Sequence, residues 1–123
     1  MNKLDFEEFL DGMITNEKVL LGYKREEYAR RNADVLINFK QNAAFLKCSP
    51  EEVCLAYMMK HIQSISIAIT DAIRNGESLE FEWETASGQE GLAQRFADAR
   101  NYMLLLGALI SEDNDADPTE SDA

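Results

Sequence analysis

The residues best suited to chemistry in this chain are Lys60, His61 and Ser64, inside the apolar stretch AYMMKHIQSISIAIT at residues 56–70. His61 is the only histidine of the chain. On a helix, residue Tyr57 shares one face with His61 and Ser64, and we call these three residues the polar strip. Lys60 lies beside it, one turn before Ser64. An ammonium, an imidazole and a hydroxyl together can bind an anion, but a solvated helix face has the same pattern. A strip that lines a pocket and a strip that faces water are both open interpretations.

A second polar group occurs in QRFADARNYMLLLGALI, residues 94–110. It consists of Asp98, Asn101 and Tyr102, and Arg95 and Arg100 flank it. In one interpretation Asp98 pairs with a surface arginine and Tyr102 extends to solvent. In the other, Asp98 and Tyr102 face Lys60 and His61 across a cavity shared by two helices.

Helical signals dominate the chain and predict an all-α fold, a four-to-five-helix bundle with one extended excursion. The alternation of Leu79, Phe81 and Trp83 with glutamates predicts that excursion, an extended or β-like segment with one face on the core. The expected elements are one long helix or a close pair over 4–28, helices over 35–47 and 50–75, the extended segment over 79–84, and a last helix over 89–111. We treat 1–111 as one helical domain.

The helix boundaries follow from local capping signals. Asn32 or Asp34 offers an N-cap for the second helix. Ser49, followed by Pro50 and by Glu52 three residues after the serine, forms a capping box that predicts the start of the third helix, and Gly76 predicts its end.

Three apolar stripes are expected to form the core, because they recur at helical spacing. The stripes are Leu36, Phe39, Ala43 and Leu46 in the second helix, Met58, Ile62, Ile65, Ile69 and Ile73 in the third, and Phe96, Met103, Leu106 and Ile110 in the last.

The net charge of −11 is concentrated at one end of the chain. Six of the 23 acidic residues lie in 112–123, so the rest of the chain has 17 acidic against 12 basic residues, a charge of about −5. We expect 112–123 to be a disordered, solubilising tail, with a docking peptide as the alternative. Because binding to the nucleic-acid backbone depends on clustered Lys and Arg, this balance disfavours direct DNA backbone binding.

Two features predict a soluble intracellular protein without membrane contact. Cys48 and Cys54 have no cluster of Cys or His around them in the sequence, so we expect free thiols in a reducing compartment. The sequence shows neither a secretion signal nor an uninterrupted apolar run of the length that spans a bilayer.

Several segments resemble, in order and spacing, small proteins encoded by tailed phages and prophages. The segments are GYKREEYARRNADVLINFKQNAAF, KHIQSI and DARNYMLLLGALI. These proteins are similar to the nucleotide-modification-associated helical domain and, distantly, to the all-α MazG-type nucleoside triphosphate pyrophosphohydrolases. Residues that match the family pattern are Tyr28, Asp34, Asn38, Phe39, Lys60, His61, Ser64, Asp98, Asn101 and Tyr102. The resemblance implies a location in the host-cell cytoplasm, and Phe39 is expected to be structural.

The pyrophosphohydrolases hold Mg²⁺ with paired carboxylates three residues apart on helices, because a cation that bridges phosphates needs several oxygen ligands. This chain departs from that pattern: Arg95 stands three residues before Asp98, and Lys24 stands three residues before Glu27. We therefore predict no cofactor and no metal site, with Mg²⁺ only if the protein is a hydrolase that uses Asp34 and Asp98. A glycine-rich phosphate loop, a G-x-S-x-G motif and a Cys/His metal motif are also absent from the sequence.

Three hypotheses of function follow. In the first, the protein binds a nucleotide, with Lys60, His61 and Lys24 at the phosphates and Tyr28 or Tyr102 stacked on the base, in nucleotide metabolism or in sequestration of a host signal. In the second, it is an interaction module that inhibits a host defence or replication protein. In the third, it is a Mg²⁺-dependent nucleotide pyrophosphohydrolase. Homo-oligomer formation is a further expectation, because residues 104–110 carry more apolar surface than one helix face needs.

Overall fold

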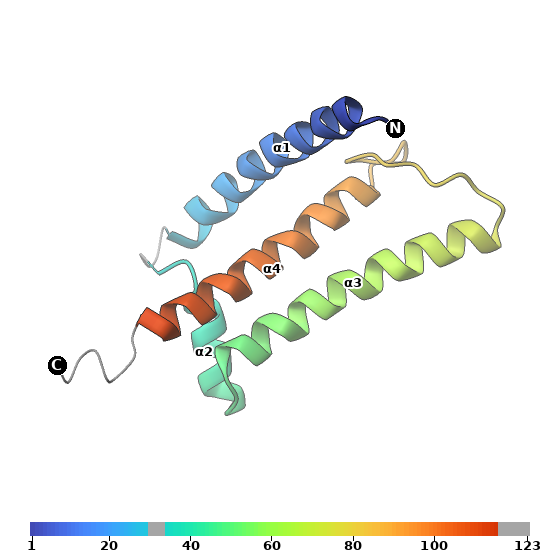
Figure 1. Cartoon of the computed structure of the whole chain (residues 1–123). Helices are drawn as coiled ribbons and strands as arrows, with labels where there is room; N and C mark the ends of the chain where they lie inside the picture. The colour runs from blue at the N-terminus through green and yellow to red at the C-terminus, as the bar shows by residue number, and fades with distance from the viewer. Residues whose placement is uncertain (30–33, 116–123) are drawn as a thin grey trace. The chain divides into compact units, whose positions relative to one another are not determined.

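The computed structural model describes the backbone of residues 1–29 and 34–115, and the side chains of 1–19 and 34–115 (Figure 1). Its helices are α1 (Lys3–Ala29), α2 (Ile37–Leu46), α3 (Pro50–Arg74) and α4 (Leu92–Asp115). The only β-type pairing within these residues is an isolated bridge between Glu84 and Glu90. The fold is therefore all-α, as predicted. The chain divides into two compact units, Met1–Ile37 and Asn38–Ala123, which are described separately.

The first unit contains α1, a single helix of 27 residues. The Asn2 Oδ1 atom accepts a hydrogen bond from the Asp5 N–H at 2.8 Å, which satisfies one of the N–H groups left unpaired at a helix start. Gly12 does not break the helix.

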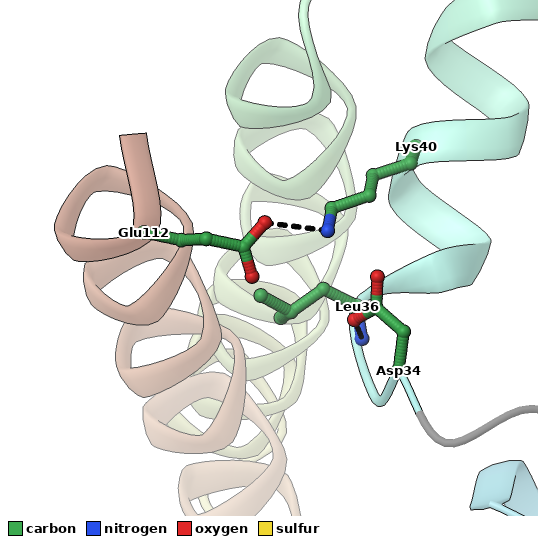
Figure 2. A network of polar contacts seen from close by, with 4 residues as sticks. All are labelled: Asp34, Leu36, Lys40 and Glu112. Atoms are coloured by element: carbon green, nitrogen blue, oxygen red, sulfur yellow. Dashed lines mark hydrogen bonds and ion pairs between the residues drawn. The ribbon is translucent and has the colours of Figure 1, made fainter. Parts of the chain in front are cut away.

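Asp34 accepts two backbone hydrogen bonds just before α2 begins. Its Oδ1 atom accepts a hydrogen bond from the Leu36 N–H at 2.9 Å, as Figure 2 shows, and its carbonyl oxygen accepts one from the Ile37 N–H. Of the two N-cap candidates, Asp34 takes this role and Asn32 lies outside the described residues. Within α2, Phe39 and Ala43 are buried as expected, but Leu46 is exposed. Lys47, with φ of 58°, ends the helix.

The capping box defines α3 as predicted. The Ser49 Oγ atom accepts a hydrogen bond from the Glu52 N–H at 3.2 Å, and Pro50 occupies the first helical position. After Asn75, Gly76 takes a φ of +67°, a conformation that favours glycine, and the helix ends there.

The segment between α3 and α4 is a loop, the first of the two forms expected for the excursion, and not a β-strand. Leu79 and Phe81 are 50% and 45% exposed, so the expected burial of one face against the core is wrong. The second half of the segment is a tight turn, in which the Thr85 N–H donates to the Gln89 carbonyl at 2.8 Å and Gly88 has a φ of +81°. The Ala93 N–H then donates to the Glu82 carbonyl at 3.0 Å. These bonds hold residues 85–91 outside the helix, so α4 begins at Leu92 and not near residue 89.

Helices α3 and α4 pack side by side and antiparallel within the second unit (Figure 1). Helix α4 continues to Asp115, so the first four residues of the expected tail are helical, and 116–123 lie outside the described residues. At this end of α4, Lys40 of α2 forms an ion pair with Glu112 (Figure 2).

The predicted core faces of α3 and α4 are confirmed only in part, since Met58 is buried and four others are half-buried: Ile65, Ile69, Phe96 and Leu106. In α3, Met58 is buried, but Ile62 is 40% exposed and Ile73 is 65% exposed. In α4, Met103 and Ile110 are exposed, whereas the buried residues include Ala93, Ala97, Asp98, Asn101 and Leu109. The polar strip of α3 also meets α4, where Tyr57, His61 and Ser64 each have a contact.

By length and composition, α3 is the one helix among the described residues that could cross a membrane. It has 25 residues and contains an 18-residue window with a mean hydropathy of 1.2. Only 17% of that window is buried. The sequence had suggested no such segment, because Lys60 and His61 interrupt the apolar run.

Candidate functional site

The polar strip of α3 meets Tyr102 of α4. The His61 and Tyr102 rings are stacked, with centroids 4.9 Å apart and planes 25° apart, and the Tyr57 ring stacks on Tyr102 at 6.0 Å. The buried Phe39 ring of α2 lies 6.2 Å from both tyrosine rings. These four residues, Phe39, Tyr57, His61 and Tyr102, form what we call the aromatic cluster.

About one turn further along α3, Ser64 contacts Arg95 of α4. The Arg95 guanidinium donates through Nη1 to the Ser64 Oγ atom at 2.8 Å and to the Ser64 carbonyl oxygen at 3.2 Å. Because hydrogen bonds from a charged donor are the stronger kind, this contact fixes the register of the two helices. The sequence had placed Arg95 only at the edge of the polar group of α4. The spacing could have indicated this role, because Arg95 stands one helical turn before Asp98 and two turns before Tyr102, on the same face of the helix.

Asp98 and Asn101 are the buried polar residues of α4, with 4% and 8% of their surfaces exposed. The Gln94 side chain donates through Nε2 to the Asp98 Oδ1 atom at 3.1 Å. The interpretation of Asp98 as a surface residue is therefore wrong, because its carboxylate is enclosed and hydrogen-bonded within the fold.

The other predicted site residues are placed less closely together. Lys60 and Asn38 are exposed, whereas the neighbouring His61 is half-buried and stacks on Tyr102. Asp34 lies in the first unit, where its side chain accepts a hydrogen bond from the Leu36 N–H, whereas Asp98 lies in the second unit. The side chains of Lys24 and Tyr28 lie outside the described residues. Tyr57, which the candidate ligand set omitted, belongs to the aromatic cluster and is 37% exposed.

Cys54 closes one end of the α3–α4 contact. Its buried Sγ atom donates to the Tyr102 carbonyl oxygen at 3.4 Å. Burial, and to a smaller extent the neighbouring Glu51 carboxylate, raises the pKa of the Cys54 thiol, so the group stays protonated and acts as a donor. Both Cys48 and Cys54 are free cysteines, as predicted.

The carboxyl groups of Glu51 and Asp113 meet where α3 begins and α4 ends. A hydrogen bond that the protonated Glu51 carboxyl group donates to the Asp113 carboxylate raises the pKa of Glu51, although a backbone hydrogen bond partly opposes this. A raised pKa in the folded state means that the folded chain binds this proton more tightly than the unfolded chain. The resulting stability is present at acidic pH and is lost as the pH rises through the folded-state pKa of Glu51.

Within the described residues, no group of three or more His, Cys, Asp or Glu side chains is arranged to hold a metal ion. Comparison of the chain with protein-family models, with curated proteins and with solved structures finds no match.

Proposed function

We propose that this protein binds a nucleotide or a nucleotide-derived small molecule at the aromatic cluster, and that it acts in the cytoplasm in nucleotide metabolism or by sequestering a nucleotide signal. The observation that carries this proposal is the stack of Tyr57, Tyr102 and His61 between α3 and α4. Aromatic faces bind bases by stacking, at about 1–3 kcal/mol per base in single-stranded nucleic acids, and they tolerate different bases.

Cationic groups next to the cluster support the proposal. The Lys60 side chain is exposed beside His61, so its ammonium is accessible to a phosphate without loss of an existing contact to α4. The Arg95 guanidinium lies at Ser64, within about one turn of the stacked rings. In this arrangement the partly exposed Tyr57 and His61 rings receive the base, and Lys60 binds the phosphates.

The single histidine provides a direct test of this site. The His61 imidazole protons give one isolated set of NMR signals, and a nucleotide stacked on the cluster will shift them. A panel of nucleoside mono-, di- and triphosphates should also raise the melting temperature of the parent protein. Lys60→Ala should weaken nucleotide binding, whereas Lys18→Ala, which removes the same charge from an exposed position of α1, should not. A parent protein that shows neither a His61 shift nor a melting-temperature change with any nucleotide refutes the proposal.

A second candidate function is an interaction module, and a different observation favours it. One face of α3 carries an exposed apolar stripe, which consists of Leu55, Met59, Ile62 and Ile73. Soluble monomers rarely display continuous apolar patches of this kind. We propose that a second copy of the chain covers this stripe, since a straight stripe along a helix can pair with itself about a two-fold axis.

Sedimentation velocity tests this self-association. The parent protein should sediment as a dimer at micromolar concentration, and Ile62→Glu should sediment as a monomer, because the carboxylate would be buried without a partner. Gln63→Glu, at the next and also exposed position, is the matched control and should leave the dimer intact. A monomeric parent over the full concentration range excludes the second copy as the cover.

A further inference from the structure

An open groove with a volume of about 260 Å³ lies between the second half of α3, the connecting segment and the first turn of α4, and no residue of the aromatic cluster lines it. Ala68 and Ala72 of α3 lie on one side, Leu92 of α4 lies on the other, and Leu79 comes from the connecting segment. Pockets for small-molecule ligands usually measure about 300–1,000 Å³ and enclose most of the ligand. This groove is smaller and open, so it suits one or two side chains of a larger partner.

The charge around the groove is strongly one-sided. Its lining includes four glutamates and one arginine: Glu77, Glu80, Glu82, Glu90 and Arg95. The sequence from 75 to 94 contains no Lys or Arg, so nothing on the connecting segment itself neutralises these carboxylates. The Arg95 guanidinium donates to Ser64. An anionic ligand such as a phosphate would be repelled here, whereas a cationic partner is attracted.

The backbone beside the groove offers a second mode of recognition. The connecting segment is exposed and neither helical nor turn-forming between Glu77 and Glu82. Backbone hydrogen bonds tie its two ends, from the Glu77 N–H to the Ala72 carbonyl and from the Ala93 N–H to the Glu82 carbonyl. Within the described residues, no backbone bond is made by Ser78, Leu79 or Glu80. An extended peptide can pair with such a segment through its own main chain.

We propose that this groove binds an extended basic peptide segment of a partner protein. The peptide places one apolar side chain on the floor formed by Ala72, Leu79 and Leu92. Its flanking Lys or Arg side chains lie against the glutamates of the rim. This proposal does not depend on the proposed nucleotide site: the groove contains Arg95 but none of the four residues of the aromatic cluster, and its glutamates favour cations, whereas the aromatic cluster with Lys60 favours an anion.

The single tryptophan makes the proposal directly testable. Trp83 follows Glu82 at the groove, so its fluorescence should report a bound peptide. The probe is a synthetic Ac-Arg-Leu-Arg-Leu-Arg-amide peptide, and the same peptide with Glu in place of Arg is its control. The basic peptide should bind saturably, with an affinity that falls as salt is added, and the acidic peptide should not bind.

Matched variants separate the groove from general attraction to an acidic protein. The double variant Glu80→Gln, Glu90→Gln should lower the affinity for the basic peptide at least tenfold. Glu7→Gln with Glu8→Gln removes the same charge from exposed positions of α1 and should change the affinity less than twofold. Ala72→Leu, which fills the floor without a change in charge, should also weaken binding. The proposal is overturned if the two double variants lose the same affinity for the basic peptide, or if the parent protein shows no saturable binding.

Discussion

Gly91 is the position at which the smallest substitution should have the largest structural effect. A Cβ atom added at Gly91 would lie 1.9 Å from the Glu82 carbonyl oxygen and 2.6 Å from its carbon, which is much closer than any real contact. Because those atoms belong to the backbone, a side-chain rotation cannot relieve the clash. The connecting segment must therefore move away from the start of α4 in the Gly91→Ala variant.

That movement breaks two backbone hydrogen bonds. One joins the Gly91 N–H to the Trp83 carbonyl at 2.9 Å, and the other joins the Ala93 N–H to the Glu82 carbonyl at 3.0 Å. At a net value of about 1 kcal/mol each, with the added cost of polar groups left unpaired, the free energy of unfolding should fall by roughly 2–4 kcal/mol.

Urea unfolding, followed by far-UV circular dichroism and by Trp83 fluorescence, measures this loss. Gly107→Ala is the matched control, because a Cβ atom at Gly107 has nothing within 4 Å and the residue lies inside α4. Alanine is the better helix former there, so this variant should gain about 0.5–1 kcal/mol. The same chemical change thus has opposite effects at the two sites. A Gly91→Ala protein that is as stable as the parent would refute the close packing of the connecting segment on α4.

Three smaller perturbations follow from the contacts of α3 and α4. Ser49→Ala removes the N-cap of α3 and should lower the free energy of unfolding by about 1 kcal/mol, measured in urea. Asp113→Asn removes the carboxyl group that raises the pKa of Glu51, so it should raise the melting temperature at neutral pH and give no such gain at acidic pH, where Glu51 is protonated. Ser64→Ala leaves Arg95 only the carbonyl partner and should lower stability by about 1 kcal/mol, with Thr at the same position recovering part of the loss.

The parts of the fold that depend on local chemistry could be predicted from the sequence. A serine, a proline and a glutamate at fixed spacing set the start of α3 through contacts within four residues, and Gly76 set its end through its own backbone angle. The proximity of His61 and Tyr102 was one of the two interpretations that the sequence left open, because each residue belongs to a polar group on an otherwise apolar helix.

The inward face of each helix could not be predicted in the same way. Apolar spacing identifies a helix, but burial of apolar residues is a one-way rule, and a folded protein still exposes much apolar surface. The short turn before α4 was missed for another reason. Thr85 and Gly88 close it through a backbone pair, a side-chain contact and a positive φ, whereas the alternation at 79–84 suggested a longer strand.

The polar strip and the exposed apolar residues of α3 connect its stability with its function. Burial of polar groups is costly unless each one finds a partner, and here the Ser64 hydroxyl contacts Arg95 while the His61 ring stacks on Tyr102. The exposed apolar stripe has the opposite requirement, since water contact at Ile62 and its neighbours is unfavourable until something covers them. One helix therefore presents two chemically different surfaces, which single substitutions can separate. Ile62→Glu should abolish self-association and leave nucleotide binding intact, whereas Lys60→Ala should weaken nucleotide binding and leave self-association intact. If either variant loses both properties, the two surfaces form a single site.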